Sequence, residues 1–276
     1  MTINCAGRLV SLDKPKVMGI VNLTPDSFFP GSRHHNAGQA VQTAGQMLAQ
    51  GASFLDLGAY STRPGAAEVS PSEEMSRLIP AVKAIVREFP AALLSVDTFR
   101  AEVAKAAVEE GAVMVNDVSA GGLDERMVAT VAQLRVPYIM MHMRGTPQTM
   151  MSDTQYDDLL RDLLLYFSKR ISMARAFGIA DLILDPGFGF SKTLDQNYRV
   201  MAHLPDLKIA GLPILVGVSR KSMVKAVAGT DAEGALNGTT ALHMAALLGG
   251  ANLLRAHDVA EAVQCVKIFE KLSENA

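Results

Sequence analysis

Three polar residues, Asp97, Asn116 and Asp185, each stand at the end of a short apolar run of this chain. They combine carboxylate acceptors with an amide that both accepts and donates hydrogen bonds. Inside an apolar pocket such a set could recognise the edge of a flat, nitrogen-rich heterocycle, and Met141 could form the pocket floor. Burial without a ligand or water would cost roughly 1 to 3 kcal/mol for each unsatisfied group. The residue types therefore indicate a heterocycle pocket.

A second set of candidate residues is cationic. Arginine pairs with phosphate oxygens through two parallel hydrogen bonds, so cations among acidic neighbours indicate an anionic group. The members of this set are Arg63, Lys221, Arg255 and His257. Asn22 and Asp26 add hard oxygen ligands, which suit Mg²⁺ with retained waters better than zinc. We therefore expect a phosphate pocket beside the heterocycle pocket.

Short apolar runs that alternate with helical patterns must position these residues. The runs cover residues 16–22, 53–58, 92–97, 113–117, 136–142, 182–185, 213–218 and 252–257. Their nearly continuous apolarity is typical of a parallel sheet that is covered on both faces. The first and last runs start about 235 residues apart, close to the roughly 250 residues of an eightfold barrel. The pattern predicts a single (β/α)8 TIM barrel domain over residues 1–276. Within it, a hairpin at residues 5–12 comes before the first barrel strand and plugs the barrel bottom.

The barrel prediction gives the polar residues a common location. The carboxyl ends of barrel strands carry the functional loops, and every one of the eight runs ends near a candidate residue. Any one of them alone could cap a helix or open a turn. Eight such residues on one rim favour a site. An open doubly wound sheet remains the alternative fold, although the first run ends without the GxGxxG of a dinucleotide site.

Composition excludes several classes of protein. The formal charge is −2, without a long basic run, which argues against nucleic acid binding. Cys5 and Cys265 lie near opposite ends of the chain and cannot form a CxxC site, which fits a reducing cytoplasm. The sequence shows neither a signal peptide pattern nor an uncharged apolar run of roughly 18 residues. We expect a cytoplasmic protein that binds small molecules.

Seven segments together resemble the dihydropteroate synthase family of folate biosynthesis. They are residues 18–28 (MGIVNLTPDSF), 61–65 (STRPG), 95–98 (SVDT), 115–117 (VND), 185–190 (DPGFGF), 217–222 (GVSRKS) and 255–258 (RAHD). The resemblance implies a (β/α)8 barrel, usually dimeric. It implies an enzyme that joins 6-hydroxymethyl-7,8-dihydropterin pyrophosphate to p-aminobenzoate with Mg²⁺ present, the pyrophosphate leaving before the amine attacks. Sulfonamides should compete with p-aminobenzoate.

The resemblance also implies a role for each matching residue. The pterin-binding residues would be Asp97, Asn116, Met141, Asp185, Lys221 and Arg255. Pyrophosphate would meet Asn22, Arg63, Arg255 and His257, with Asn22 also at the metal. The p-aminobenzoate site would comprise Thr62, Arg63, Pro64, Phe190, Lys221 and Ser222. Catalysis would rest on Asp97, Asp185, Lys221 and Arg255.

Two loops depart from the family pattern. The first runs Phe29-Pro30-Gly31-Ser32 where the family commonly has Ser-Asp-Gly-Gly, and the second has Tyr60 where the family commonly has Glu. Three alternatives stay open: a pterin-dependent methyltransferase, a Schiff-base aldolase using Lys221, and a non-catalytic pterin-binding paralogue. The STRPG and SRKS segments argue against the first. The polar surroundings of Lys221 argue against the second.

Overall fold

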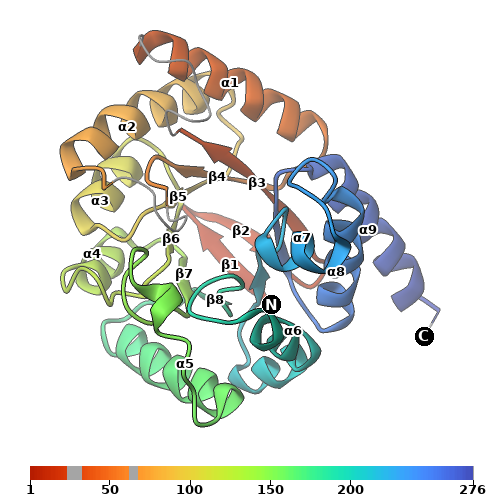
Figure 1. Cartoon of the computed structure of the whole chain (residues 1–276). Helices are drawn as coiled ribbons and strands as arrows, with labels where there is room; N and C mark the ends of the chain where they lie inside the picture. The colour runs from red at the N-terminus through yellow and green to blue at the C-terminus, as the bar shows by residue number, and fades with distance from the viewer. Residues whose placement is uncertain (24–32, 62–67, 276) are drawn as a thin grey trace.

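Within residues 1–23, 33–61 and 68–275, which the computed structural model describes, eight parallel strands form one sheet that curves into a barrel (Figure 1). The strands are β3 (Lys16–Asn22), β4 (Phe54–Gly58), β5 (Leu94–Asp97), β6 (Met114–Asp117), β7 (Tyr138–Met141), β8 (Leu182–Asp185), β9 (Leu215–Val216) and β10 (Leu253–Ala256). Their order is β8-β7-β6-β5-β4-β3-β10-β9. A parallel bridge between Leu184 and Ile214 joins the two ends of the sheet, so the barrel is nearly closed.

Each predicted run contains one of these strands, and the predicted barrel is confirmed. The runs at 16–22 and 182–185 match their strands at both ends, whereas 213–218 shrinks to Leu215–Val216. Pro213 lacks a backbone N–H and cannot donate to the ladder, and Gly217 follows the strand directly. The strand prediction was therefore too long at this position.

Helices surround the strands on the outside of the barrel (Figure 1). They are α1 (Arg33–Ala49), α2 (Pro71–Glu88), α3 (Ala101–Glu109), α4 (Met127–Leu134), α5 (Leu159–Ala176), α6 (Leu194–Ala202), α7 (Ser222–Ala228), α8 (Leu236–Leu248) and α9 (Val259–Ser273). Several begin at sequence-encoded caps: Ser70 accepts from the Glu73 amide at α2, and Thr193 with Gln196 forms a capping box at α6. In the described ranges, no helix is both long and apolar enough to cross a membrane.

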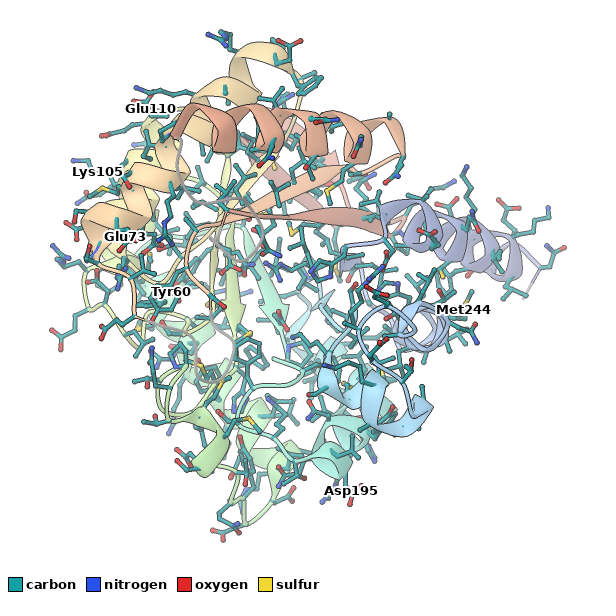
Figure 2. The ribbon with its side chains drawn as sticks, turned by 45° about the horizontal axis from the view of Figure 1, so that its top comes forward. Tyr60, Glu73, Lys105, Glu110, Asp195 and Met244 are labelled. Carbon is teal, nitrogen blue, oxygen red and sulfur yellow. The ribbon has the colours of Figure 1, made fainter. Side chains whose placement is uncertain are left out.

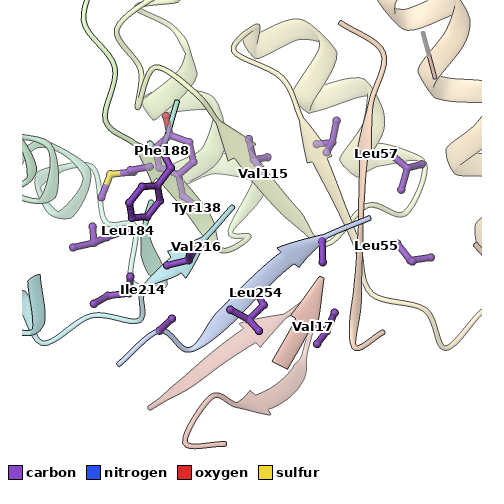
Figure 3. Packing of buried hydrophobic residues seen from close by; sticks show 14 of the residues in the cluster. Val17, Leu55, Leu57, Val115, Tyr138, Leu184, Phe188, Ile214, Val216 and Leu254 are labelled. Atoms are coloured by element: carbon purple, nitrogen blue, oxygen red, sulfur yellow. The ribbon is translucent and has the colours of Figure 1, made fainter. Parts of the chain in front are cut away.

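Alternate residues of each strand face the helices or the barrel interior. Leu55 and Leu57 of β4 belong to the large apolar cluster under the helices, and Figure 3 shows them with Val115, Leu184 and other members of that cluster. Phe54 instead belongs to a second cluster at the barrel base. Asp56 lies between the two leucines and shares the inward direction of Phe54. One strand thus supplies both the outer core and a buried carboxylate.

The amino-terminal hairpin consists of β1 (Thr2–Cys5) and β2 (Arg8–Ser11), joined through Ala6 and Gly7. Both turn residues have positive φ, as a two-residue hairpin loop requires. The hairpin begins three residues earlier than predicted because Thr2 pairs with Ser11. Ile3, Cys5 and Leu12 pack in the cluster at the barrel base, with Phe54 and other interior strand residues. The predicted hairpin plug is therefore present.

Candidate active site

A row of register partners crosses four neighbouring strands at the carboxyl end of the barrel. Asn22 of β3 pairs with Gly58 of β4, Gly58 with Asp97 of β5, and Asp97 with Asn116 of β6. Register partners in parallel strands share a face of the sheet, so these side chains lie on one side. A Cβ on Gly58 would lie 3.4 Å from Asp97 Cβ, so glycine leaves room beside that carboxylate.

Arg255 connects this row to the opposite part of the barrel. Its Nε donates to Oδ2 of Asp56 at 2.6 Å, and its Nη2 donates to Oδ2 of Asp97 at 2.7 Å. Asn116 Nδ2 donates to the same Asp56 oxygen at 2.9 Å. Three of the predicted residues, Asp97, Asn116 and Arg255, thus belong to one hydrogen-bonded network with Asp56.

Sequence reasoning missed Asp56. It lies in the middle of β4, not at the strand end where candidates were sought, and it is fully buried. The signal was present in the sequence, because a lone carboxylate interrupts the apolar run Phe54-Leu55-Asp56-Leu57. A charged residue in a strand covered on both faces requires a buried partner. That requirement could have identified it.

Lys221 lies beside the loop that follows β8. Its Nζ donates to the carbonyl oxygen of Phe188 and stands 4.8 Å from the centre of the Phe190 ring. A Cβ on Gly217 would meet Arg255 Cβ at 3.8 Å and Lys221 Nζ at 4.0 Å, so these two cationic side chains approach each other around Gly217. Asp185, the last residue of β8, directly precedes this loop, and its Oδ1 accepts from the Gly187 amide at 2.8 Å.

A buried lysine supports this loop from behind. Lys192 Nζ donates to the carbonyl oxygens of Gly187 at 3.0 Å and Phe190 at 3.1 Å, and lies 3.0 Å from His142 Nδ1. Burial lowers the pKa of Lys192 to about 7, opposed by the charge of Asp185. Burial, then the charge of Lys192, lowers the pKa of His142 well below its usual value. The neutral ring that this pKa favours can accept a hydrogen bond from the Lys192 ammonium at Nδ1.

Burial shifts the pKa values of the charged residues at the barrel mouth. It raises the pKa of Asp97 to about 7, against the opposing charge of Arg255, and it raises the pKa of Asp185 against the opposing charge of Lys221. It lowers the pKa of Lys221 to about 8, again opposed by Asp185. Burial also lowers the pKa of Arg255, but Asp56 and Asp97 outweigh that effect and the net pKa is raised. These four residues therefore lie within electrostatic reach of one another.

The other predicted residues that the structure describes lie near the carboxyl ends of their strands. Met141, the register partner of Asp185, belongs to a small apolar cluster against which Phe190 packs. His257 Nδ1 lies 3.0 Å from Ser219 Oγ, just after β10. Ser222 is the first residue of α7. Thr62, Arg63, Pro64 and Asp26 lie outside the described residues, as does the first variant loop, residues 29–32.

Tyr60, labelled in Figure 2, stands where the family commonly has glutamate. Its hydroxyl accepts from Gln148 Nε2 at 2.7 Å, and its ring meets Phe99 edge to face at 5.1 Å. The guanidinium of Arg100 also stands 5.1 Å from the ring centre. The tyrosine is thus held by neighbouring loops rather than directed into solvent, unlike the exposed Glu73, Lys105 and Asp195 in the same view.

A magnesium site would depend on Asn22 and on the substrate. Among the described residues, no cluster of three His, Cys, Asp or Glu side chains could hold a metal. Mg²⁺ commonly uses one or two protein oxygens together with substrate phosphates and water. Asn22 offers one amide oxygen at the end of β3, half-buried at the rim, so its chemistry fits such a site.

The family of the chain follows from comparison with known proteins. The family described as "Pterin binding enzyme" matches residues 18–257. The chain therefore belongs to the family of pterin binding enzymes. Within that family it is similar to the dihydropteroate synthase of Synechocystis, with 43% identity over 93% of this chain and 89% of that protein. It is 40% identical to the dihydropteroate synthase of Escherichia coli, over 98% of this chain and 96% of the relative.

Solved structures show the same relationship. A Xanthomonas albilineans dihydropteroate synthase with 4-aminobenzoic acid has a TM-score of 0.92 at 41% identity, over 99% of this chain and 98% of the other. The Yersinia pestis enzyme in a sulfonamide drug complex has a TM-score of 0.93 at 41% identity, over 99% of this chain and 100% of the Yersinia chain. A Xanthomonas complex with 7,8-dihydropteroate has a TM-score of 0.89 at 39% identity, over 99% of each chain. The family predicted from the motifs and its barrel fold are confirmed.

Proposed function

We propose that this protein catalyses the dihydropteroate synthase reaction. It joins 6-hydroxymethyl-7,8-dihydropterin pyrophosphate to p-aminobenzoate and releases pyrophosphate and 7,8-dihydropteroate. The observation that carries the proposal is the network in which Arg255 bridges Asp56 and Asp97, with Asn116 on the same oxygen. Relatives and solved structures favour this reaction over the methyltransferase, the aldolase and the non-catalytic paralogue.

The pterin ring binds against the buried polar side chains at the barrel mouth. Asn116 and Asp185 are 4% and 6% exposed, so a ring that reaches them leaves water and gains strong hydrogen bonds. The carboxylate of Asp185 and the amide of Asn116 recognise donors on the ring edge, and Lys221 supplies a donor from the neighbouring loop. Met141 provides an apolar surface for the face of the ring.

The diphosphate group binds on the cationic side of the rim. Arg255 lies in β10 and His257 follows that strand by one residue, so both approach the leaving group from the same strand end. Asn22 would hold Mg²⁺, which supplies positive charge to the diphosphate oxygens when it is bound. Arg63, outside the described residues, belongs to the same proposal.

The p-aminobenzoate ring lies near Phe190 and Lys221, and its carboxylate meets Ser222. Thr62, Arg63 and Pro64 complete this part of the proposal. The Lys221 ammonium over the Phe190 ring gives this corner both an apolar surface and a positive charge. An aromatic carboxylate requires both. A sulfonamide, which resembles p-aminobenzoate in shape, competes at the same place, as the drug complex of the Yersinia relative supports.

The reaction proceeds by departure of the diphosphate before attack by the amine. The carbon–oxygen bond to the diphosphate breaks and its electron pair leaves with the oxygen, so a cation forms on the pterin methylene. The carboxylates of Asp97 and Asp185 stabilise that cation, and Arg255 stabilises the departing charge. The amine nitrogen of p-aminobenzoate then forms the new bond and loses a proton. No covalent enzyme intermediate is needed.

Purified protein tests the proposal directly. The pterin pyrophosphate, p-aminobenzoate and Mg²⁺ are supplied together, and pyrophosphate and dihydropteroate are measured separately. Both products should form in equal amounts, should require the diphosphate on the pterin, and should decrease when EDTA removes Mg²⁺. A folded protein that binds the pterin but yields no dihydropteroate would instead be the non-catalytic paralogue.

The quaternary structure and cellular location extend the same proposal. We expect a cytoplasmic homodimer, which sedimentation should detect as a particle of twice the 29.4 kDa chain mass. A monomeric mass at micromolar concentration would contradict this part of the proposal. Fractionation of the source cells would test the location.

A further inference from the structure

Asp56 is a buried charge whose hydrogen-bond partners, among the residues that the structure describes, all belong to the proposed pterin site. It is fully buried, with Leu55 and Leu57 on either side in β4. Burial of a carboxylate is strongly unfavourable unless charged or polar partners compensate it. Asp56 therefore depends on the groups that it contacts, and those groups depend on it.

One oxygen of Asp56 makes both contacts. Oδ2 accepts from Arg255 Nε at 2.6 Å and from Asn116 Nδ2 at 2.9 Å. Oδ1 is buried and has no hydrogen-bond partner among the residues that the structure describes. Within the described part of the chain, the carboxylate thus makes no hydrogen bond to the barrel backbone or to a loop.

Asp117, on the strand after next, shows what a purely structural buried carboxylate looks like here. It is also fully buried, but it accepts from the Ser119 amide, the Gly121 amide and the Tyr138 hydroxyl at 2.6 to 2.8 Å. These partners anchor the loop after β6. Asp56 has no equivalent local partners in the described chain, so its contacts serve the site.

The contacts determine which groups face the ligand. A carboxylate only accepts hydrogen bonds here, so Asn116 must turn Nδ2 toward Asp56 and its Oδ1 elsewhere. The guanidinium of Arg255 is held at two points, Nε on Asp56 and Nη2 on Asp97, which fixes its plane. Without Asp56, both the amide and the guanidinium could rotate.

We propose that Asp56 is a positioning residue of the reaction, whose carboxylate orients Arg255 and Asn116 for the pterin pyrophosphate. The inference rests on the proposed function. Asp56 acts through these two side chains and does not itself contact the substrate. The proposal therefore predicts effects on pterin binding and turnover and little effect on p-aminobenzoate.

Three variants distinguish the hydrogen bonds that Asp56 accepts from its negative charge and from its contribution to packing in the barrel. Asp56→Asn keeps one oxygen, which is sufficient because Oδ2 alone accepts both bonds. Asp56→Ala removes the acceptor. Ser95→Ala is the matched control, because Ser95 is the register partner of Asp56 on β5, is equally buried, and has an Oγ without a partner in the described residues. All three variants are checked for folding by circular dichroism and thermal unfolding before the assay.

We expect Asp56→Ala to lower kcat/KM for the pterin pyrophosphate by 100-fold or more. Binding of that substrate in the absence of p-aminobenzoate should weaken at least tenfold, and KM for p-aminobenzoate should stay within threefold. Asp56→Asn should stay within tenfold of the unaltered protein, and Ser95→Ala within twofold. A folded Asp56→Ala variant with unchanged kinetics would overturn the proposal. So would a 100-fold loss in Asp56→Asn, since charge rather than orientation would then be responsible.

A double variant tests whether Asp56 acts through Arg255. Asp56→Ala should cost at least tenfold less in an Arg255→Ala background than in the unaltered protein, because coupled residues do not act additively. Equal costs in both backgrounds would overturn the proposal. If Asp56→Ala alone fails to fold, Asp56→Leu, which removes the acceptor and fills its space with apolar atoms, takes its place in both comparisons. Turnover by the unaltered protein is measured in parallel. Its absence would defeat the proposed function, whereas normal turnover with no effect of Asp56 variants would defeat only this inference.

Discussion

Arg255 and Asp97 form an ion pair at 2.7 Å although 158 residues separate them in sequence. Asp97 is at the end of β5 and Arg255 is in β10, with β4 and β3 between these strands in the sheet. The pair is accessible, because the two side chains are 16% and 18% exposed. Without a ligand, the guanidinium of Arg255 is thus paired with the Asp97 carboxylate that the proposed reaction uses. A bound diphosphate must share Arg255 with that carboxylate.

The first prediction concerns the removal of this cation. Arg255→Ala leaves Asp56 and Asp97 without their shared partner. Removing the partner of a fully buried charge such as Asp56 costs about 3 to 5 kcal/mol of stability. It also removes charge stabilisation from the transition state, so kcat/KM should fall roughly 100-fold or more. Urea unfolding and the pyrophosphate assay measure the two effects.

Arg255→Lys is the control for charge alone. A lysine keeps the positive charge but lacks the planar fork that donates to two carboxylates at once. We expect its stability to lie between that of the unaltered protein and that of Arg255→Ala, with activity still reduced at least tenfold. Full activity in Arg255→Lys would show that the fork is unnecessary.

The second prediction concerns the pH dependence of stability. Burial raises the pKa of Asp97 to about 7, whereas an unfolded aspartate titrates near 3.9. Between these values the folded state binds more protons, so the free energy of unfolding decreases as pH rises, by at most about 1.4 kcal/mol per pH unit for this one group. Asp97→Asn removes the titration and should make the decline between pH 4 and 7 shallower.

Urea unfolding of both proteins at several pH values in this window tests the effect of Asp97. The difference between the two curves isolates Asp97 from other buried carboxyl groups with raised pKa values, such as Asp117 and Asp185. Parallel curves would mean that Asp97 is already ionised at pH 4 in the folded protein.

The third prediction concerns activity at alkaline pH. Burial lowers the pKa of Lys221 to about 8, so its ammonium loses its proton as pH rises through that value. Since the proposed role of Lys221 uses the charged form, kcat/KM should decline above pH 8. Lys221→Arg keeps a charge that does not titrate in this range, and its lower activity should show no such decline. The measurement is kcat/KM of both proteins between pH 6 and pH 10. The same decline above pH 8 in Lys221→Arg would mean that a group other than Lys221 titrates there.

The sequence predicted the barrel well because the strand runs are apolar and separated by helical patterns. It also predicted Asp97, Asn116, Lys221 and Arg255 as neighbours, since strand ends of a barrel converge. It could not predict the partners within the network. Which carboxylate receives Arg255 depends on the barrel curvature and on side-chain rotamers, neither of which spacing encodes. The contact between Asp56 and Arg255 could not be predicted for this reason, although a carboxylate inside an apolar run was visible in the sequence. The support that Lys192 gives to the loop after Asp185 depends on the same kind of long-range packing.

The last prediction concerns the backbone of the loop that follows Asp185 and β8. Gly187 has φ +70°, and a Cβ there would lie 2.1 Å from the carbonyl oxygen of His142. Gly187→Ala therefore forces the backbone to move, in addition to the about 1 to 2 kcal/mol that a left-handed alanine costs. The movement displaces the amide that binds Asp185 and the carbonyl that Lys192 holds. Pterin binding and stability should both decrease.

Gly211→Ala is the matched control for Gly187→Ala. Gly211 has φ +64° after the short helix at Leu204–Ala210, and no described atom lies within 4 Å of its added Cβ. It should therefore show only the cost of the left-handed conformation, about 1 to 2 kcal/mol, with normal pterin affinity. Urea unfolding should show Gly187→Ala to be less stable than this control by at least about 1 kcal/mol, because overpacking against a backbone atom adds its own strain. Equal stability and affinity in the two variants would mean that the loop has room to relax, and that its position does not depend on the close approach of Gly187 to His142.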